Sequence, residues 1–111
     1  MLMTIVLATA VSCSHAQTQL AMNTCTAQAA KADDAREQKA YAALVAHVEA
    51  PDKPLVQAAE RAWSAYRDAE CKATAARFTG GSIMATELST CRSTLDADRI
   101  RVLQAAMREG G

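Results

Sequence analysis

The chain has 111 residues, which is enough for one small domain, and half of its residues are apolar, 26 of them alanine. Twelve Lys and Arg residues balance twelve Asp and Glu residues, so the formal net charge is zero. This composition excludes a strongly basic nucleic-acid-binding protein, a polybasic membrane module and a disordered tail.

The first eleven residues carry no charge and no turn-forming residue. A bilayer span needs about 20 apolar residues, whereas this shorter stretch has the length of the hydrophobic region of a secretory signal. Residues 8–10 read Ala-Thr-Ala, a cleavage motif that predicts a signal peptide over 1–10 and a periplasmic or secreted mature chain over 11–111 without a transmembrane span. A cut after Ala16 is disfavoured because it would discard Cys13, and a lipid anchor on Cys13 is the alternative to a free mature chain.

A first helix is expected from Thr18, a good N-cap residue, to about Glu49. Pro51 and Pro54 end it, since proline disfavours helix in the residue before it. The inward stripe is predicted to follow Ala30, Asp34, Glu37, Tyr41, Leu44 and Val48. Its N-terminal half is weakly apolar and needs another tether, which Cys25 supplies if it is disulfide-bonded.

A second helix is expected from near Pro54, which suits a first turn, to Thr79. Gly80 and Gly81 end it, because glycine suits the left-handed position past a helix C-terminus. Steps of four and three residues predict an inward seam of Leu55, Ala59, Ala62, Tyr66, Ala69, Ala73 and Ala76. Trp63 and Phe78 add bulk beside this seam.

A third helix is expected to begin at Thr86 as N-cap, with Glu87 in the first turn. Its predicted stripe is Leu88, Cys91, Leu95, Val102 and Ala106, widened by Ile100, Leu103 and Met107. No segment alternates with the period of a strand. Short connections make consecutive helices antiparallel, so the predicted fold class is all-α, a small antiparallel three-helix bundle stapled by disulfides.

Four cysteines, at positions 13, 25, 71 and 91, remain in the predicted mature chain. An even number in a short secreted chain predicts two disulfides, and three pairings are possible. Cys71 and Cys91 come level in an antiparallel hairpin that turns at Gly80, which favours Cys71–Cys91 with Cys13–Cys25. The alternative is Cys25–Cys91 with Cys13–Cys71. No Cys-x-x-Cys motif is present, so structural disulfides are favoured over redox catalysis.

No motif for catalysis, cofactor binding or metal binding is found. Ser82 is not in a Gly-x-Ser-x-Gly elbow, and the glycine patterns of phosphate and dinucleotide sites are absent. His15 with Cys13 and Cys25 matches no zinc spacing, and oxidised cysteines cannot bind metal. The sequence therefore predicts a protein that binds a protein partner, rather than an enzyme.

The densest cluster of interaction-prone side chains contains Trp63, Arg67 and Asp68. Trp63 and Arg67 share a helix face, so Arg67 can stack on Trp63 and pair with Asp68 or with another helix. Because Trp, Tyr and Arg dominate interface hot spots, one hypothesis makes this cluster a partner anchor. The alternative is structural: Trp63 and Tyr66 fill the core and Arg67 is a buried tie.

The turn between the second and third helices is the other candidate contact surface. It comprises Gly80, Gly81, Ser82, Ile83 and Met84, of which Ile83 and Met84 are expected to be exposed. The alternative is a plain connector in which Ile83 caps the end of the core.

Two strings resemble the LprI-type family of lysozyme inhibitors. The first is Cys-x-x-Ala-x-Thr-Gln-x-x-Met-Asn-x-Cys at 13–25. The second is Ala-x-Arg-Ala-Trp-x-x-Tyr-Arg-Asp-Ala-x-Cys at 59–71, followed by Gly80-Gly81-Ser82 and by Cys91, Leu95 and Arg99. The resemblance covers about Cys13 to Leu103 and supports keeping Cys13 in the mature chain.

The resemblance implies a secreted, helical, disulfide-containing envelope domain that inhibits lysozyme by occluding its cleft; the alternative is an envelope interaction or structural protein. The chain departs from the family pattern at three positions: Glu37-Gln38 stands where relatives carry Leu-Asn, and Asp96 stands where they carry Thr. Glu37 is expected to weaken packing or to mark an exposed face. The carboxylate pairs 33/34 and 96/98 are expected to be solvated, and with Glu37 they form a second candidate contact for a basic lysozyme.

Overall fold

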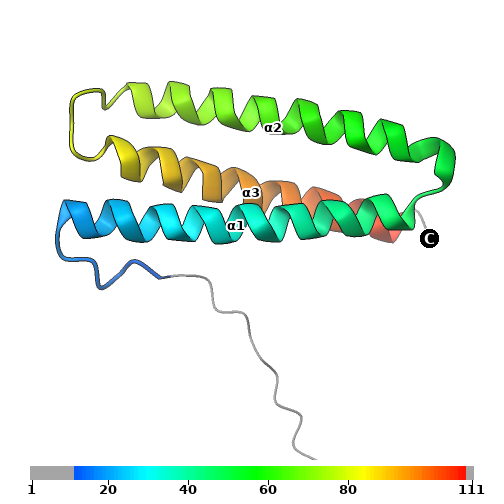
Figure 1. Cartoon of the computed structure of the whole chain (residues 1–111), viewed down its shortest axis with the longest axis horizontal. Helices are drawn as coiled ribbons and strands as arrows, with labels where there is room; N and C mark the ends of the chain where they lie inside the picture. The colour runs from blue at the N-terminus through cyan, green and yellow to red at the C-terminus, as the bar shows by residue number, and fades with distance from the viewer. Residues whose placement is uncertain (1–11, 110–111) are drawn as a thin grey trace, which may run out of the picture.

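A computed structural model describes residues 12–109 of the chain. It contains α1 (Gln19–His47), α2 (Lys53–Ala76) and α3 (Met84–Glu109), with the 3-10 turn η1 (Ala50–Asp52) between α1 and α2. The three long helices lie side by side, with α1 and α3 running in one direction and α2 in the other (Figure 1). The all-α antiparallel bundle is confirmed, and the described range holds no strand. The predicted signal peptide lies outside that range.

The first helix begins where its capping residue predicts. The Thr18 Oγ1 accepts a hydrogen bond from the Ala21 backbone N–H at 3.0 Å, which satisfies one of the donors left free at a helix N-terminus. At the other end the Val48 N–H still donates to the Leu44 carbonyl, after which Pro51 enters the 3-10 turn. The two boundaries fix α1 as a helix of 29 residues.

The third helix begins earlier than predicted. It starts at Met84, so Thr86 is a helical residue and its assignment as the N-cap is wrong, although Glu87 does lie in the first turn. The Thr86 hydroxyl instead donates to Asn23 on α1, at 2.5 Å. The preceding turn places Gly80 at φ +84°, a conformation that favours glycine. The left-handed conformation predicted for Gly80 is therefore confirmed. The predicted end of the second helix at Thr79 is wrong, because α2 ends at Ala76 and the Phe78 and Thr79 N–H groups already form tighter turns.

Both disulfides have the pairing that the hairpin geometry favoured. Cys71 on α2 bonds to Cys91 on α3, with the Cα atoms 5.5 Å apart. Cys13 bonds to Cys25, with the Cα atoms 5.7 Å apart, and ties the N-terminal arm to the first part of α1. Cys71 is completely buried, so this disulfide also fixes which side of α2 faces the interior.

Removing the Cys71–Cys91 bond by replacing both residues with serine is expected to lower the free energy of unfolding by about 3 kcal/mol. The closed loop spans 20 residues, and opening it restores entropy to the unfolded chain. Urea titration followed by circular dichroism measures the loss. The Cys13/Cys25 double serine variant is the comparison: it frees an arm at the chain end, so α2 and α3 should keep their cooperative transition. Equal and negligible losses in both variants would contradict this prediction.

The inward faces of the helices differ in how well the sequence predicted them. On α1 the predicted stripe is correct, with Ala30, Glu37 and Leu44 buried. On α2 the predicted seam is wrong, because all seven of its residues are exposed, including Leu55 at 69% and Tyr66 at 53%. The buried residues of α2 are Glu60, Arg67, Cys71 and Ala75, which lie on the opposite side of the helix.

On α3 the predicted stripe is rotated by one residue. Leu88 and Val102 are exposed, whereas their neighbours Ser89 and Leu103 are buried, together with Asp96. One residue corresponds to about 100° around a helix, which is enough to turn a stripe away from the interior. The three residues that were predicted to widen the stripe agree better with the structure, since Leu103 is buried and Ile100 and Met107 are half-buried.

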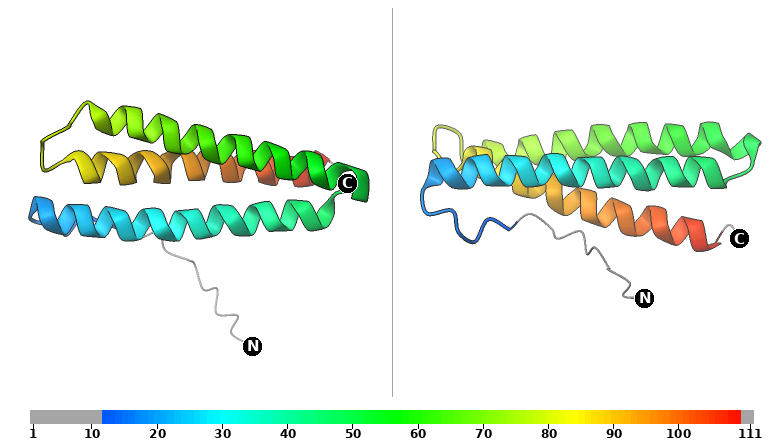
Figure 2. Two further views of the ribbon diagram at one scale, coloured as in Figure 1. Left: turned by 45° about the horizontal axis from the view of Figure 1, so that its top comes forward. Right: turned by 60° about the horizontal axis from the view of Figure 1, so that its bottom comes forward.

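The interior is shared almost equally by apolar and polar residues. The most extensive helix contact joins α1 and α3, while α2 packs mainly on α3 and touches α1 sparingly (Figure 2). Five apolar residues are buried, and so are five polar or charged ones: Glu37, Glu60, Arg67, Ser89 and Asp96. Among residues 12–109 no helix has both the length and the apolar character that crossing a membrane requires.

Candidate interaction surface

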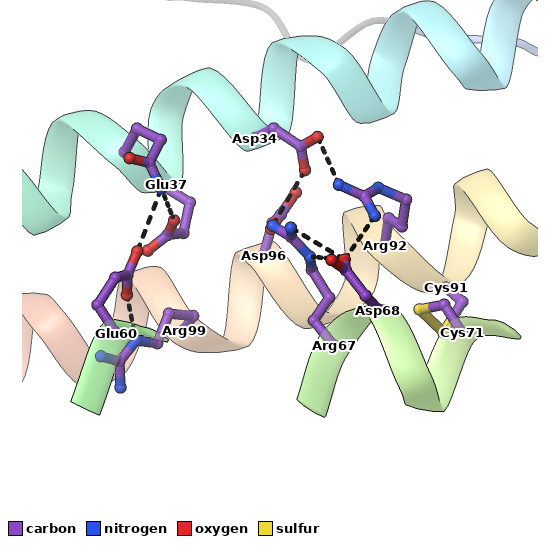
Figure 3. A network of polar contacts seen from close by, with 11 residues as sticks. Asp34, Glu37, Glu60, Arg67, Asp68, Cys71, Cys91, Arg92, Asp96 and Arg99 are labelled. Carbon is purple, nitrogen blue, oxygen red and sulfur yellow. Dashed lines mark hydrogen bonds and ion pairs between the residues drawn. A yellow bond between two sulfur atoms is a disulfide. The ribbon is translucent and has the colours of Figure 1, made fainter. Parts of the chain in front are cut away.

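Arg67 lies at the point where the three helices meet (Figure 3). Its guanidinium is 3.2 Å from the Asp96 carboxylate on α3 and 3.5 Å from Asp34 on α1. It also contacts Asp68 on its own helix, at 3.1 Å. Because only 8% of Arg67 is exposed, its donors are used within the chain. This geometry favours the interpretation of Arg67 as a buried tie between helices.

Trp63 contributes to the same interior cluster. The Arg67 guanidinium lies 5.0 Å from the centre of the Trp63 ring and that of Arg99 lies 5.5 Å from it, so two cations face one indole. Trp63 is half-buried. Of the three residues in the predicted anchor, Asp68 alone has a largely exposed side chain, at 57%. The hypothesis of a partner anchor here therefore has little free surface to support it.

A second arginine, which lies on α3, also connects the three helices. Arg92 contacts Asp34 at 3.0 Å and Asp68 at 2.7 Å, so it joins α3 to both other helices. Burial alone would raise the pKa of Asp34, but hydrogen bonds with Asp96 and Arg92 and the charges of Arg92 and Arg67 hold that pKa below its ordinary value. Asp34 is consequently the ionised partner of both arginines.

A pair of glutamates from α1 and α2 lies beside this cluster. The Gln38 amide donates to Glu37 at 2.9 Å and to Glu60 at 3.2 Å, and Arg99 donates to Glu60 at 3.2 Å. Glu37 is fully buried and Glu60 is 5% exposed. The prediction that Glu37 marks an exposed face is therefore wrong, because Glu37 is buried and meets the carboxyl group of Glu60 across the helix interface.

These groups form one carboxylate–arginine network with more carboxyl groups than arginines. Its members are Asp34, Glu37, Glu60, Asp68 and Asp96 with Arg67, Arg92 and Arg99. Two of its oxygens, Glu37 Oε2 and Asp96 Oδ2, are buried without a hydrogen-bond partner. An ionised oxygen left in this state is costly. Protonation of Glu37 and Asp96 leaves three carboxylates for three guanidiniums.

The pKa values of these two residues agree with that charge balance. Burial and the neighbouring Glu60 together raise the pKa of Glu37 to about 8, against the opposing hydrogen bond from Gln38. Burial and the neighbouring Asp34 raise the pKa of Asp96 to about 7, although Arg67 opposes the shift. Both carboxyl groups therefore hold a proton at mildly acidic pH inside the folded chain.

The acidic groups on α1 and α3 are mostly unavailable as a contact for a basic partner. Asp96 is completely buried, so the expectation of a solvated Asp96 is wrong, and Glu37 is buried with it. Asp33 forms an ion pair with Arg36, and Asp98 with Arg101. The sequence missed the network because charged residues on helices are usually solvated. The signal that reveals it is the position of Arg67, one turn from the buried Cys71.

The chemistry of a metal site is not found in the described part of the chain. No group of three or more His, Cys, Asp or Glu side chains within residues 12–109 has a suitable arrangement. Cys13 and Cys25, which stand near His15 in the sequence, are joined to each other. Their sulfurs are consequently unable to bind a metal.

The turn that joins α2 to α3 is exposed and held from both sides. Gly80, Gly81, Ser82 and Ile83 are exposed and Met84 is half-buried. The Gly81 N–H donates to the Phe78 carbonyl at 2.9 Å, and the Met84 N–H donates to the Gly81 carbonyl at 3.3 Å. From α1, the Asn23 amide donates to the Ser82 carbonyl at 2.9 Å. We call residues 80–83 the turn surface.

The contact from Asn23 is itself fixed by neighbouring side chains. Gln19 donates to Asn23 Oδ1 at 2.8 Å and to the Thr86 hydroxyl at 3.0 Å, and Thr86 donates to the same Asn23 oxygen. The string at 13–25 and the Gly-Gly-Ser string at 80–82 therefore meet at one end of the bundle. This juxtaposition could not be predicted from the sequence alone, because it depends on the parallel course of α1 and α3.

A family model described as "Lysozyme inhibitor LprI" matches residues 11–103. An uncharacterized protein of Rhizobium meliloti (strain 1021) is 32% identical over 108 residues, which cover 86% of this chain and 78% of that protein. No solved structure matches the chain at a significant level.

Proposed function

Because the chain belongs to the LprI family of lysozyme inhibitors, we propose that it is a periplasmic or secreted module that inhibits a lysozyme by protein–protein contact. Its two disulfides fit an oxidising compartment outside the cytoplasm. A signal peptide over residues 1–10 would deliver it there. The Cys13 sulfur is bonded to Cys25, which leaves no thiol for a lipid anchor and favours a free mature chain.

The turn surface is the contact that we propose for the lysozyme. Its small residues and the exposed Ile83 form the tip of the hairpin, a shape that suits entry into a concave substrate cleft. The single observation that carries this assignment is the hydrogen bond from Asn23 to the Ser82 carbonyl. Because α1 holds the turn in place before binding, little conformational entropy is lost when a partner binds.

One observation favours the alternative, an envelope protein that binds a partner without inhibiting lysozyme. The net charge is zero, and the buried carboxyl groups Glu37 and Asp96 add no negative surface. A strongly basic lysozyme would therefore receive little electrostatic steering from this chain. Retention on isolated cell-wall sacculi in the absence of lysozyme would support this alternative.

Replacing Ile83 with aspartate is expected to weaken inhibition at least about tenfold, because a charge in the centre of a contact must be desolvated without a partner. The assay is lysozyme-driven clearing of a cell-wall suspension, titrated with the oxidised mature chain. Val102→Asp is the matched control: Val102 is also an exposed aliphatic residue, 58% against 38% for Ile83, but it lies in the C-terminal half of α3, away from the turn surface.

The two variants separate three results. Loss of inhibition in Ile83→Asp alone, with unchanged circular dichroism, supports the turn surface as the contact. Equal loss in both variants, or in neither, would refute that assignment while leaving inhibition itself established. A folded wild-type chain that inhibits no tested animal or bacterial lysozyme at tens of micromolar would refute the proposed inhibition and favour the alternative.

A further inference from the structure

A groove runs between α1 and α3, far from the turn surface. Its volume is about 530 Å³, within the range of small-molecule sites. One face of α1 and one face of α3 line it: Arg36, Lys39, Ala40 and Ala43, and Ile100, Gln104, Met107 and Arg108. In the helix, 20 residues separate Asn23, which holds the turn, from Ala43 in the groove, a distance of about 30 Å. The groove lies toward the end of the bundle where α3 diverges from α1 (Figure 2).

The floor of the groove is apolar because of where small residues stand. Ala40 and Ala43 on α1 face Ile100 and Met107 on α3, and the two short side chains leave space that larger ones would fill. A spacing of three residues on α1, and of seven residues or about two turns on α3, places each set on one face of its helix. Ile100 and Met107 are half-buried, so they present part of their surface to the groove.

The rim of the groove is cationic. Lys39 on α1 and Arg108 on α3 line it, both exposed, and neither forms an ion pair with any residue between 12 and 109. Arg36 also lines it and is paired with Asp33. No carboxylate lines the groove. Positive charge next to an apolar floor complements one kind of ligand, an acyl chain that ends in an anionic group.

We propose that this groove binds a free single-chain fatty acid. The acyl chain lies over Ala40, Ala43, Ile100 and Met107, and the carboxylate pairs with Lys39 or Arg108. Lysine and arginine bury their methylene stems and keep the charge in water, so either residue covers the chain while it meets the headgroup. This site is independent of the proposed lysozyme contact.

The probe is dodecanoate at a concentration below micelle formation, added to the oxidised mature chain with ¹³C-labelled methionine methyl groups. We expect a saturable shift of the Met107 methyl resonance. Met22 and Met84, which lie at the turn end of the bundle, serve as internal references and should not shift. Dodecyltrimethylammonium, with the same chain and a cationic headgroup, should cause no saturable shift. The proposal would be overturned if the Met107 methyl resonance shifted equally with dodecanoate and with dodecyltrimethylammonium. It would also be overturned if this resonance did not shift with dodecanoate.

Two sets of variants separate the roles of charge and shape. Lys39→Glu with Arg108→Glu should weaken dodecanoate binding about tenfold or more, whereas Lys31→Glu with Lys72→Glu, a matched reversal of exposed lysines outside the groove, should leave it unchanged. Ala43→Phe, at an exposed position that tolerates bulk, should fill the groove and abolish binding. Binding that survives both groove variants, with circular dichroism confirming the fold, would refute the site.

Discussion

Replacing Arg67 with alanine is expected to lower the free energy of unfolding by about 3–5 kcal/mol at pH 8, a large share of the stability of a small domain. Arg67 contacts Asp34, Asp68 and the fully buried Asp96. Without its guanidinium, Asp96 must either stay ionised inside the bundle with no nearby cation or take up a proton against the pH. Both alternatives destabilise the folded chain.

Arg61→Ala is the matched control for this variant. Arg61 lies on the same helix but is exposed and forms no ion pair within residues 12–109. Its removal should change stability by no more than about 0.5 kcal/mol. Chemical denaturation of both variants and of wild type measures the difference. A loss no larger for Arg67→Ala than for Arg61→Ala would show that the buried contacts contribute nothing net.

The cost of Arg67→Ala should itself depend on pH. Burial raises the pKa of Asp96 to about 7, so at pH 5 this carboxyl group is neutral in the folded state of both wild type and variant. The unpaired charge that the substitution creates at pH 8 is then absent. We therefore expect a clearly smaller loss at pH 5. An equal loss at both pH values would mean that the charge of Asp96 contributes nothing to the cost, which would then come from packing and from the pairs with Asp34 and Asp68.

The breaks between the helices could be predicted because single residues specify them, although α2 ends and α3 begins a few residues earlier than predicted. Thr18 caps α1, Pro51 interrupts the chain after it, and Gly80 takes up the left-handed conformation at the turn. The disulfide pairing followed from the same boundaries, since a hairpin of known length places Cys71 level with Cys91. Such features are local, and they do not depend on which side of a helix faces the interior.

The inward face of α2 could not be predicted from apolar spacing, because alanines occur on several sides of this helix. A seam of alanines differs little in hydrophobicity from its surroundings, so the position of larger and polar groups decides the orientation. The buried Cys71 is the better guide, since one turn before it stands Arg67, and Glu60 lies on the same side. This reasoning also reveals the network that the candidate-site predictions missed.

Glu37 and Asp96 each have a buried oxygen without a hydrogen-bond partner within residues 12–109. Each also meets a second carboxyl group across a helix interface, which is Glu60 for Glu37 and Asp34 for Asp96. The network has more carboxyl groups than arginines, so ionising these two acids leaves buried negative charge unbalanced. Sensitivity to alkaline pH is therefore expected as a property of this chain's own residues.

We expect the folded protein to be most stable at about pH 5 and to lose stability steadily as the pH rises to about 8.5. The ordinary pKa values of Glu37 and Asp96 are 4.5 and 3.8, and in the folded chain they are raised to about 8 and about 7. Between these limits the folded chain keeps protons that the unfolded chain has released. Each group then lowers the free energy of unfolding by up to about 1.4 kcal/mol per pH unit.

The pH dependence that Glu37 and Asp96 give to the free energy of unfolding has the opposite sign to that of ordinary paired carboxylates. The stabilisation from a raised pKa is complete below the unfolded value and is lost as the pH rises through the folded value. Asp34, whose pKa is lowered, behaves in the other way and loses its contribution as the pH falls. Melting temperatures at closely spaced pH values from 4 to 9 should therefore show a maximum on the acidic side of neutrality.

Substituting Glu37 with glutamine should remove most of its share of this dependence. The amide has the shape of the protonated carboxyl group and carries no charge, so the variant should match wild type near pH 5 and exceed its stability at pH 8.5. Asp96→Asn should act in the same direction over a range that ends nearer pH 7. Glu70→Gln, an exposed carboxylate on α2, is the control and should leave the profile unchanged. Glu37 faces Glu60 and Gln38, whereas Asp96 faces Asp34 and Arg67, so the two acids have separate surroundings. The double variant should therefore flatten the stability profile further than either substitution alone. A wild-type profile that is already flat from pH 5 to 8.5 would show that neither buried acid holds its proton.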